Sequence, residues 1–354
     1  MKTFIRSAAC ISPQHTFQNQ FFLNKPVEYT GTRLKAIEPD YTAFIDAKLA
    51  RRMSHVIKMG VAAAKDCLHQ ANTAMPGAVI TGTALGCVED TISFVTRMIG
   101  FNEQMLPPTA FIQSTHNTVA AQIALSLKCH AYNNTFVHKG ISFESALLDA
   151  VMLLKEQEAD DILIGGIEEM TDVSHTVLTR LGLFKRWPVS NLSLFKTPSK
   201  GSIGGEGAAF FLFTGNTSAD NLAQFNGVQT HYRLSNTVEI AQKITGFLAR
   251  HELSINDIDL VITGRNGDLK NDATYHQLNK TIFANTALAN YKHLCGEYAV
   301  STSFALWLAA NIIKRQEIPD IVKENEAKQP SPKKILIYNH YLNTYHSLML
   351  LSAC

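Results

Sequence analysis

Strand-like and helix-like segments alternate along almost the whole of the 354-residue chain. The apolar runs Ala78–Gly82 and 161–166 predict buried strands, whereas 53–70 and Ser142–Lys155 show apolar residues at helical spacing. Residues 3–11, 116–127 and 134–137 predict a strand, a helix and a strand in the same series. Such alternation is typical of an α/β fold with mostly parallel sheets, because a helix is the usual crossover between parallel strands.

The order of elements in the first part of the chain recurs in the second part. The second round is helix 237–250, strand 258–263, helix 272–283, helix 300–314, strand 334–338 and a last strand 346–352. A strand is expected at the end of each series, at residues 208–213 in the first and 346–352 in the second. We therefore predict two related halves, 1–215 and 216–354, divided in a polar loop rich in Thr, Ser, Asn and Asp.

Composition excludes several classes of function. The net charge of +2 is too small to predict binding to nucleic acid or to an anionic membrane surface. No stretch approaches the roughly 20 apolar residues that span a bilayer. The six cysteines are scattered without a CxxC pair, which favours reduced thiols and a cytoplasmic protein. The thirteen histidines show no HExxH spacing, so we expect neither a metal site nor a cofactor.

Three motifs follow one another at consistent spacing between residues 107 and 213. They are the small-residue helix Asn-Thr-Val-Ala-Ala-Gln at 117–122, a strand ending in Gly-Gly-x-Glu at 165–168, and the turn Gly-Gly-Glu-Gly-Ala at 204–208. In this order they resemble the β-ketoacyl-acyl-carrier-protein synthases (ketosynthases). The resemblance covers nearly the whole chain and implies a thiolase-like fold, with two related α/β halves in a five-layered αβαβα arrangement.

The nucleophile of that family is a cysteine at an elbow between a strand and a helix. A helix N-terminus suits a thiolate because its free N–H groups and dipole favour negative charge. Ungapped counting back from Gly165 places the elbow at His138-Lys-Gly-Ile-Ser142, with Gly140 at the cysteine position. Glycine has no side chain that could hold an acyl thioester.

The two catalytic histidines of the family are also replaced. The His-Gly-Thr-x-Thr motif corresponds to Thr263-Gly-Arg-Asn-Gly-Asp268, which places Gly264 at the first histidine. The Lys-x-x-x-Gly-His motif corresponds to Lys292-His-Leu-Cys-Gly-Glu297, where Glu297 stands at the second histidine. A carboxylate there would repel a developing enolate. Since losing members of a catalytic set typically costs about 10⁴ to 10⁶ in rate, we expect no ordinary condensation by this chain alone.

The leading hypothesis is therefore a non-catalytic subunit similar to chain-length factors, acting in fatty-acid or polyketide-type chain elongation. The resemblance implies an acyl carrier protein and an active ketosynthase as partners, the latter in a heterodimer. The segment around 114–133 most resembles ketosynthase-like proteins of aryl-polyene or flexirubin pathways. The alternatives are an active acyltransferase with a non-standard site at Cys295 or His138, and a homodimer that binds acyl chains or carrier protein.

Five residues near these motifs are candidates for a pocket: His138, Lys139, Arg265, His293 and Cys295. His138 and Lys139 either line an electropositive pocket or fill the space of the missing thiol. Cys295 is either a relocated nucleophile or a buried small apolar residue. Arg265 could contact Glu297 or a phosphopantetheine phosphate, and Lys292 with Glu297 could form a structural ion pair.

Ketosynthases form dimers by pairing the strand before the elbow across a two-fold axis, which the resemblance transfers to residues 134–137. Burying such an edge also removes an aggregation hazard. We therefore predict a dimer, and the expected interface residues are His116, Asn117, Asn134, Phe136 and Val137.

Overall fold

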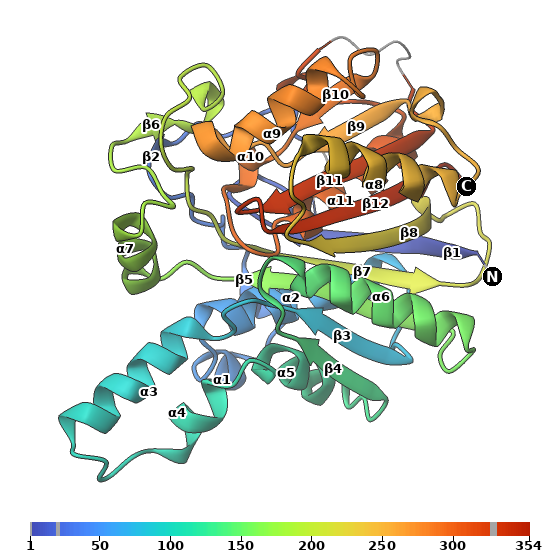
Figure 1. Ribbon diagram of the computed structural model, residues 1–354. Coiled ribbons are helices and arrows are strands. Elements are labelled where there is room, and N and C mark those ends of the chain that lie inside the picture. Colours follow the sequence, from blue (N-terminus) through green and yellow to red (C-terminus); the bar gives the residue numbers. More distant parts are fainter. Residues whose placement is uncertain (1, 19–21, 326–330) are drawn as a thin grey trace.

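Ten strands of the computed structural model form one large, twisted sheet, covered by helices on both faces (Figure 1). The structure describes residues 2–18, 22–325 and 331–354. The strand order is β10-β9-β11-β12-β8-β1-β7-β5-β3-β4. The five strands from the first part of the chain are β1 (Thr3–Ile11), β3 (Ala78–Gly82), β4 (Tyr132–Phe136), β5 (Asp161–Glu168) and β7 (Gly207–Thr214). The five from the second part are β8 (Ala223–Tyr232), β9 (Leu260–Thr263), β10 (Ala287–Asn290), β11 (Lys334–Tyr341) and β12 (Tyr345–Ser352).

The two sets of strands have the same topology. From the outer edge of the sheet inwards, the first set runs β4, β3, β5, β7, β1 and the second set runs β10, β9, β11, β12, β8. Counted along the chain, both sets therefore run third, second, fourth, fifth and first strand. The sets meet where β1 lies antiparallel to β8, over the three pairs Thr3↔Phe225, Phe4↔Gln224 and Ile5↔Ala223. The predicted division into 1–215 and 216–354 lies in the loop between β7 and β8, and it stays a prediction.

Ten of the helices connect or cover these strands. They are α2 (His55–Gln70), α3 (Val88–Gly100), α4 (Pro108–Gln113), α5 (Thr118–Leu127), α6 (Ser142–Lys155), α7 (Asp172–Arg180), α8 (Thr237–Ala249), α9 (Leu269–Lys280), α10 (Lys292–Cys295) and α11 (Thr302–Arg315). A single-turn helix, α1 (Ala47–Ala50), precedes α2, and a small second sheet pairs β2 (Thr30–Gly31) with β6 (Val189–Ser190).

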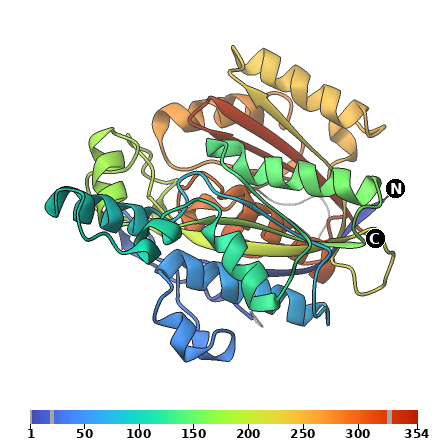
Figure 2. The same cartoon turned by 90° about the horizontal axis from the view of Figure 1, so that it is seen from below.

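Three large clusters of buried apolar side chains lie between the layers of helices and strands. Figures 1 and 2 show the layers themselves. In the central cluster, α6 and α11 pack between the two halves of the sheet. On the outer faces, α2 and α5 cover the first half, and α8 and α9 cover the second. The order helix, sheet, helix, sheet, helix confirms the expected five-layer fold. The sequence of α6 explains its central place, because Phe143, Ala146, Leu147, Ala150 and Leu154 form one buried stripe.

The expectation of mostly parallel strands is wrong. Four neighbouring pairs of the large sheet are parallel and five are antiparallel. The parallel pairs all involve strands joined by a crossover helix. By contrast, β12 follows β11 through a tight turn in which Leu342 and Asn343 adopt positive φ angles, and such a hairpin forces antiparallel pairing.

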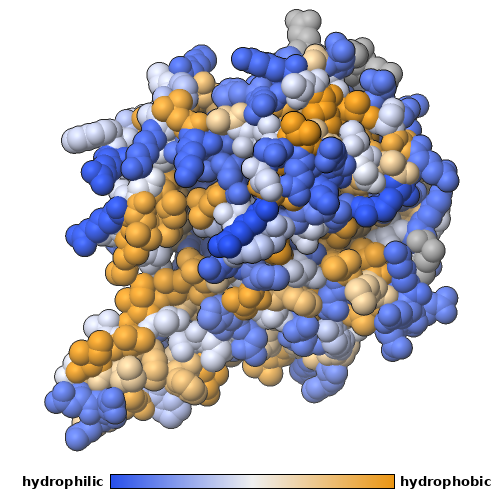
Figure 3. All heavy atoms as spheres, viewed as in Figure 1, coloured by the Kyte–Doolittle hydropathy of each residue, from blue (hydrophilic) through white to orange (hydrophobic). Residues whose placement is uncertain are grey.

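An arm formed by α3 and α4 projects from the body of the molecule (Figure 1). Its surface is strongly apolar (Figure 3), with exposed fractions of 70% for Ile99 and 91% for Met105. The sequence analysis named no element for α3 or α4, nor for β8 and β10. No helix in the described part of the chain is long and apolar enough to cross a membrane.

Candidate active-site cavity

The elbow between β4 and α6 forms as expected, but a tyrosine occupies the space where a nucleophile would stand. Ser142 shapes the turn, since its Oγ accepts a hydrogen bond from the backbone N–H of His138 at 2.7 Å. Gly140 is buried there. A Cβ atom added to Gly140 would lie 2.4 Å from Cβ and 2.7 Å from Cγ of Tyr341. Tyr341 ends β11, and its side chain leaves no room for a cysteine side chain at this position.

The first histidine position is filled by other side chains in the same way. Gly264 follows β9, and a Cβ added to it would lie 2.0 Å from Oδ1 of Asn339 and 2.7 Å from Oη of Tyr275. Both side chains are held in place: Tyr275 Oη accepts a hydrogen bond from the N–H of His340 at 2.8 Å, and Asn339 Oδ1 accepts one from Tyr291 at 3.3 Å. No histidine fits there without moving this cluster.

Glu297, at the second histidine position, is part of a buried ion pair. Lys292 Nζ lies 2.8 and 3.0 Å from its two carboxylate oxygens, and Asn266 Nδ2 donates a further hydrogen bond at 2.6 Å. Lys292 is 1% exposed. Burial of both charges is tolerated because each is the partner of the other and Glu297 accepts a further hydrogen bond from Asn266. The carboxylate is thus neutralised by this chain's own lysine.

The three altered motifs surround one cavity of about 290 Å³. Lys139 comes from the elbow, Asn266 from the loop after β9, Glu297 from the turn after α10, and Tyr341 from the end of β11. Apolar side chains form most of the rest of the wall: Ala84, Leu85, Met170, Leu178, Leu183, Phe184, Tyr298, Ala299 and Leu342. A volume near 300 Å³ is at the lower end of small-molecule sites. The cavity therefore suits a short apolar group, and none of the described residues that line it is a cysteine.

Glu168 also lines this cavity, at the end of β5. Its carboxylate accepts hydrogen bonds from the N–H groups of Ala84 and Leu85 at 2.8 and 3.1 Å, and from Thr83 Oγ1 at 3.2 Å. Burial raises the pKa of Glu168 to about 7 despite these bonds. Glu168 thereby ties the loop after β3 to the end of β5.

Of the five candidate pocket residues, Lys139 alone lines the cavity. His138 is exposed beside it. Arg265 is buried and contacts neither Glu297 nor the cavity: its guanidinium pairs with Glu324, lies 3.7 Å from Asp272, and stacks over Phe195.

Cys295 and His293 are both buried and do not form a nucleophile–base pair. Burial raises the pKa of the Cys295 thiol well above its usual value, and its Sγ contacts the carbonyl of Gly296 at 3.3 Å. His293 Nε2 instead bonds to the carbonyl of Ile321 at 2.9 Å, and burial lowers the pKa of this histidine to about 4. Because a thiolate is the reactive form of cysteine, this environment does not favour Cys295 as a nucleophile.

The predicted interface residues lie along one edge of the molecule. Asn134 and Phe136 belong to β4, the outermost strand, which pairs with β3 alone in the described structure. Val137 is 48% exposed just beyond it, and His116 and Asn117 precede α5 on the neighbouring surface. The arm of α3 and α4 extends from the same side (Figures 1 and 2).

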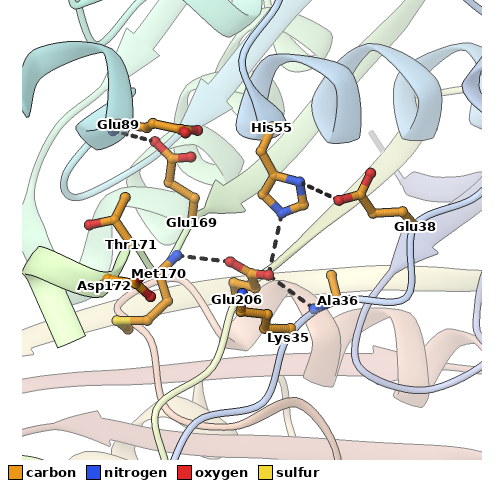
Figure 4. A pocket seen from close by; sticks show the side chains of 10 residues that line it. All are labelled: Lys35, Ala36, Glu38, His55, Glu89, Glu169, Met170, Thr171, Asp172 and Glu206. Atoms are coloured by element: carbon orange, nitrogen blue, oxygen red, sulfur yellow. Dashed lines mark hydrogen bonds and ion pairs between the residues drawn. The ribbon is translucent and has the colours of Figure 1, made fainter. Parts of the chain in front are cut away.

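A second pocket, of about 260 Å³, lies on the other side of Met170 (Figure 4). Glu206, in the Gly-Gly-Glu-Gly-Ala turn, accepts hydrogen bonds there from the N–H groups of Ala36 and Met170 at 3.0 and 2.9 Å. His55 lies between Glu206 and Glu38, at 3.3 and 3.1 Å. Burial alone would lower the pKa of His55, but its hydrogen bond to Glu206 and the surrounding carboxylates raise it. Glu206 thus joins three separate segments, a structural role for this turn.

Comparison with known proteins supports the expected fold and the resemblance to ketosynthases. Residues 29–190 match the family model of the β-ketoacyl synthase N-terminal domain. This part of the chain thus resembles the N-terminal domain of a ketosynthase. A search of curated proteins finds no match to the sequence.

Solved structures show the same fold over the full length of the ketosynthase-like chain. The ishigamide ketosynthase/chain length factor superposes with a TM-score of 0.83 at 15% identity, covering 100% of this chain and 99% of that one. A β-ketoacyl synthase from Burkholderia phymatum STM815 gives 0.79 at 15% identity, with the same coverage. A type II polyketide-synthase ketosynthase, in complex with its acyl-carrier protein and bound to the hexaketide, gives 0.80 at 14% identity, again covering 100% and 99%.

The sequence analysis missed the residues that fill the site. Tyr341, Asn339 and Tyr275 occupy the space beside Gly140 and Gly264. Tyr341 lies far from Gly140 in sequence and Asn339 far from Gly264, whereas Tyr275 follows Gly264 by 11 residues. Glu144 was also missed. It is buried in the first turn of α6 near the hydroxyl groups of Ser347 and Thr302, and burial raises its pKa to about 7. An acidic residue within an otherwise apolar helical stripe was the available signal.

Proposed function

We propose that this chain is a non-catalytic ketosynthase-like subunit of the chain-length-factor type, acting in polyketide or fatty-acid-type acyl chain elongation. The carrying observation is the place of Tyr341 against Gly140, which leaves no space for a nucleophile at the elbow. The structural similarity to a ketosynthase/chain length factor supports the proposal. So does the similarity to a ketosynthase in complex with an acyl-carrier protein.

The partners we propose are an active ketosynthase, in a heterodimer, and an acyl carrier protein. Two surfaces on one side of the molecule support a protein partner. The outer edge of β4 has no strand partner in the described structure, and the adjoining arm exposes large apolar side chains. Apolar patches of this kind mark interaction sites in soluble proteins. We place this role in the cytoplasm, in a pathway of the aryl-polyene or flexirubin type.

Co-purification with the active ketosynthases of such pathways tests the proposal. We expect a stable complex with one of them, which Ile99→Glu in the arm should weaken strongly because a charge would be buried at the interface. Val238→Glu is the matched control, since Val238 is 64% exposed against 70% for Ile99 but lies on α8, away from the arm. Recovery of a homodimer alone with every candidate ketosynthase would contradict the proposal.

Mass spectrometry after incubation with acyl-carrier-protein and acyl-coenzyme A thioesters tests catalysis directly. We expect no covalent acyl adduct. An adduct that disappears in Cys295→Ala would establish the acyltransferase alternative instead.

The apolar cavity favours a second candidate function, a homodimer that binds acyl chains or carrier protein without reaction. Native mass spectrometry distinguishes it, because this alternative requires bound lipid or acyl-carrier protein in the absence of an active ketosynthase.

A further inference from the structure

Strand β8, which pairs with β1 where the two sets of strands meet, has one backbone edge that is open for most of its length. β8 pairs with β12 along its length, but β1 pairs with Ala223, Gln224 and Phe225 only. In the described part of the chain, residues 226–232 have no strand partner on that side. Open edges of this kind are templates for a further strand.

The open edge faces a groove of about 530 Å³ that is lined by residues of β8, α6 and α8. Figure 1 shows where these three elements lie. Its apolar wall includes Leu148 and Val151 of α6, Phe225 and Val228 of β8, and Phe247 of α8. Leu148 remains 51% exposed, so the groove is not closed by its own side chains. Its lining residues on α6 lie about 9 to 20 Å along the helix from the elbow, and none of the residues that line the groove lines the candidate active-site cavity.

The charges that line the groove all have one sign. Lys2, Lys155, Arg250 and His251 contribute basic groups, and no Asp or Glu is among the lining residues. The pKa of His251 is lowered, first by burial and then by the positive charges of Arg250 and Lys155. The groove therefore favours negative charge beside an apolar surface.

A break in the pairing of β8 with β12 lies within the same groove. The register shifts between Phe225 and Gly227, which leaves Asn226 as an extra residue. Asn226 Oδ1 is buried without a hydrogen-bond partner in the described structure. A bulge can also protect an edge against aggregation, but an unsatisfied acceptor is not needed for protection.

We propose that this groove binds a short, extended, acidic segment of a partner protein, which adds its backbone to the open edge of β8. Main-chain hydrogen bonds to 226–232 supply the register, alternate apolar side chains contact the groove wall, and acidic side chains pair with Lys155 and Arg250. The inference does not depend on the proposed function in chain elongation.

Fluorescence anisotropy with a labelled eight-residue peptide that alternates Val and Glu tests the proposal. We expect saturable binding that weakens with salt, and a loss of about tenfold or more in affinity for Lys155→Glu/Arg250→Glu. The control variant Lys128→Glu/Lys280→Glu makes the same change of net charge at exposed lysines elsewhere, and should bind as the wild type does. A peptide that alternates Val and Lys should not bind.

Two further measurements separate strand addition from simple anion binding. Hydrogen exchange should show that the amides of 226–232 become protected when the Val-Glu peptide binds. The same peptide with N-methyl groups on alternate amides should lose binding. Equal binding of a Glu-Ser-Gly peptide of the same charge, displacement by inorganic phosphate, or no binding of the Val-Glu peptide would each overturn the proposal.

Discussion

Replacing Gly140 by alanine should destabilise the protein through a single contact. The new Cβ would lie 2.4, 2.7 and 2.8 Å from Cβ, Cγ and Cδ1 of Tyr341, whereas carbon atoms normally approach to about 3.5–4.0 Å. Tyr341 cannot retreat easily, because β11 and β12 hold its backbone. Forcing an extra methyl group into packed surroundings costs about 1–3 kcal/mol, and we expect Gly140→Ala to fall in the upper part of that range.

The assay is urea unfolding, with the midpoint compared between variants. Gly246→Ala is the control, because a Cβ at Gly246 on the exposed face of α8 meets nothing within 4 Å. That change should stabilise the protein by about 0.4–1 kcal/mol, since alanine is the better helix residue. In Tyr341→Gly, the further change Gly140→Ala should cost much less, because the atoms in conflict are gone. Equal effects of Gly140→Ala in both backgrounds would refute the steric argument.

The same geometry predicts how a restored nucleophile behaves. Gly140→Cys alone should form no acyl adduct with acyl-coenzyme A thioesters, because its side chain meets Tyr341. Only Gly140→Cys combined with Tyr341→Gly provides room for a thiol at the elbow. Intact-protein mass spectrometry would measure this, and an adduct on the single variant would contradict the expectation.

Three further predictions concern buried charges and are measured by urea midpoints. Glu297→His should destabilise by about 3–5 kcal/mol, because it leaves Lys292 buried without a counter-charge; replacing both residues by methionine should cost less. The pKa of His55 is raised, so its pairing with Glu206 stabilises the protein fully below about pH 6.5 and this stabilisation is lost as pH rises through the folded-state pKa. The free energy of unfolding of wild type should therefore exceed that of His55→Gln by less above the folded-state pKa than below about pH 6.5. Burial raises the pKa of Glu144 to about 7. The free energy of unfolding of the wild type should therefore fall relative to that of Glu144→Gln as pH rises from about 4.5 to 7, and the difference between the two should not change with pH below this window.

The fold could be predicted because its signals are local in the sequence. The buried runs of β3 and β5 and the apolar stripe of α6 each reveal their own structure, and the structure confirms the expected layers. The antiparallel returns of β7 and β12 were not anticipated, because periodicity specifies a strand without its direction. The helix α3 of the arm was missed although Ile92, Val95 and Ile99 give it an apolar stripe at helical spacing, so the signal was present in the sequence.

The candidate site was predicted only in part, for a different physical reason. Gly140, Gly264 and Glu297 could be found by spacing within their motifs. Much of what fills the space beside the two glycines comes from distant residues: Tyr341 lies 201 positions after Gly140, and Asn339 lies 75 positions after Gly264. A sequence pattern shows that a side chain is missing, whereas only packing shows what has replaced it.

The contact between Gly140 and Tyr341 also constrains how this protein can change. A side chain at 140 conflicts with the tyrosine, and removal of the tyrosine alone opens a void beside a glycine. Whichever of the two positions changed first, the protein would therefore lose stability before the second change could make room for a nucleophile at the elbow. Such mutual dependence means that positions 140 and 341 can be exchanged without loss of stability only together.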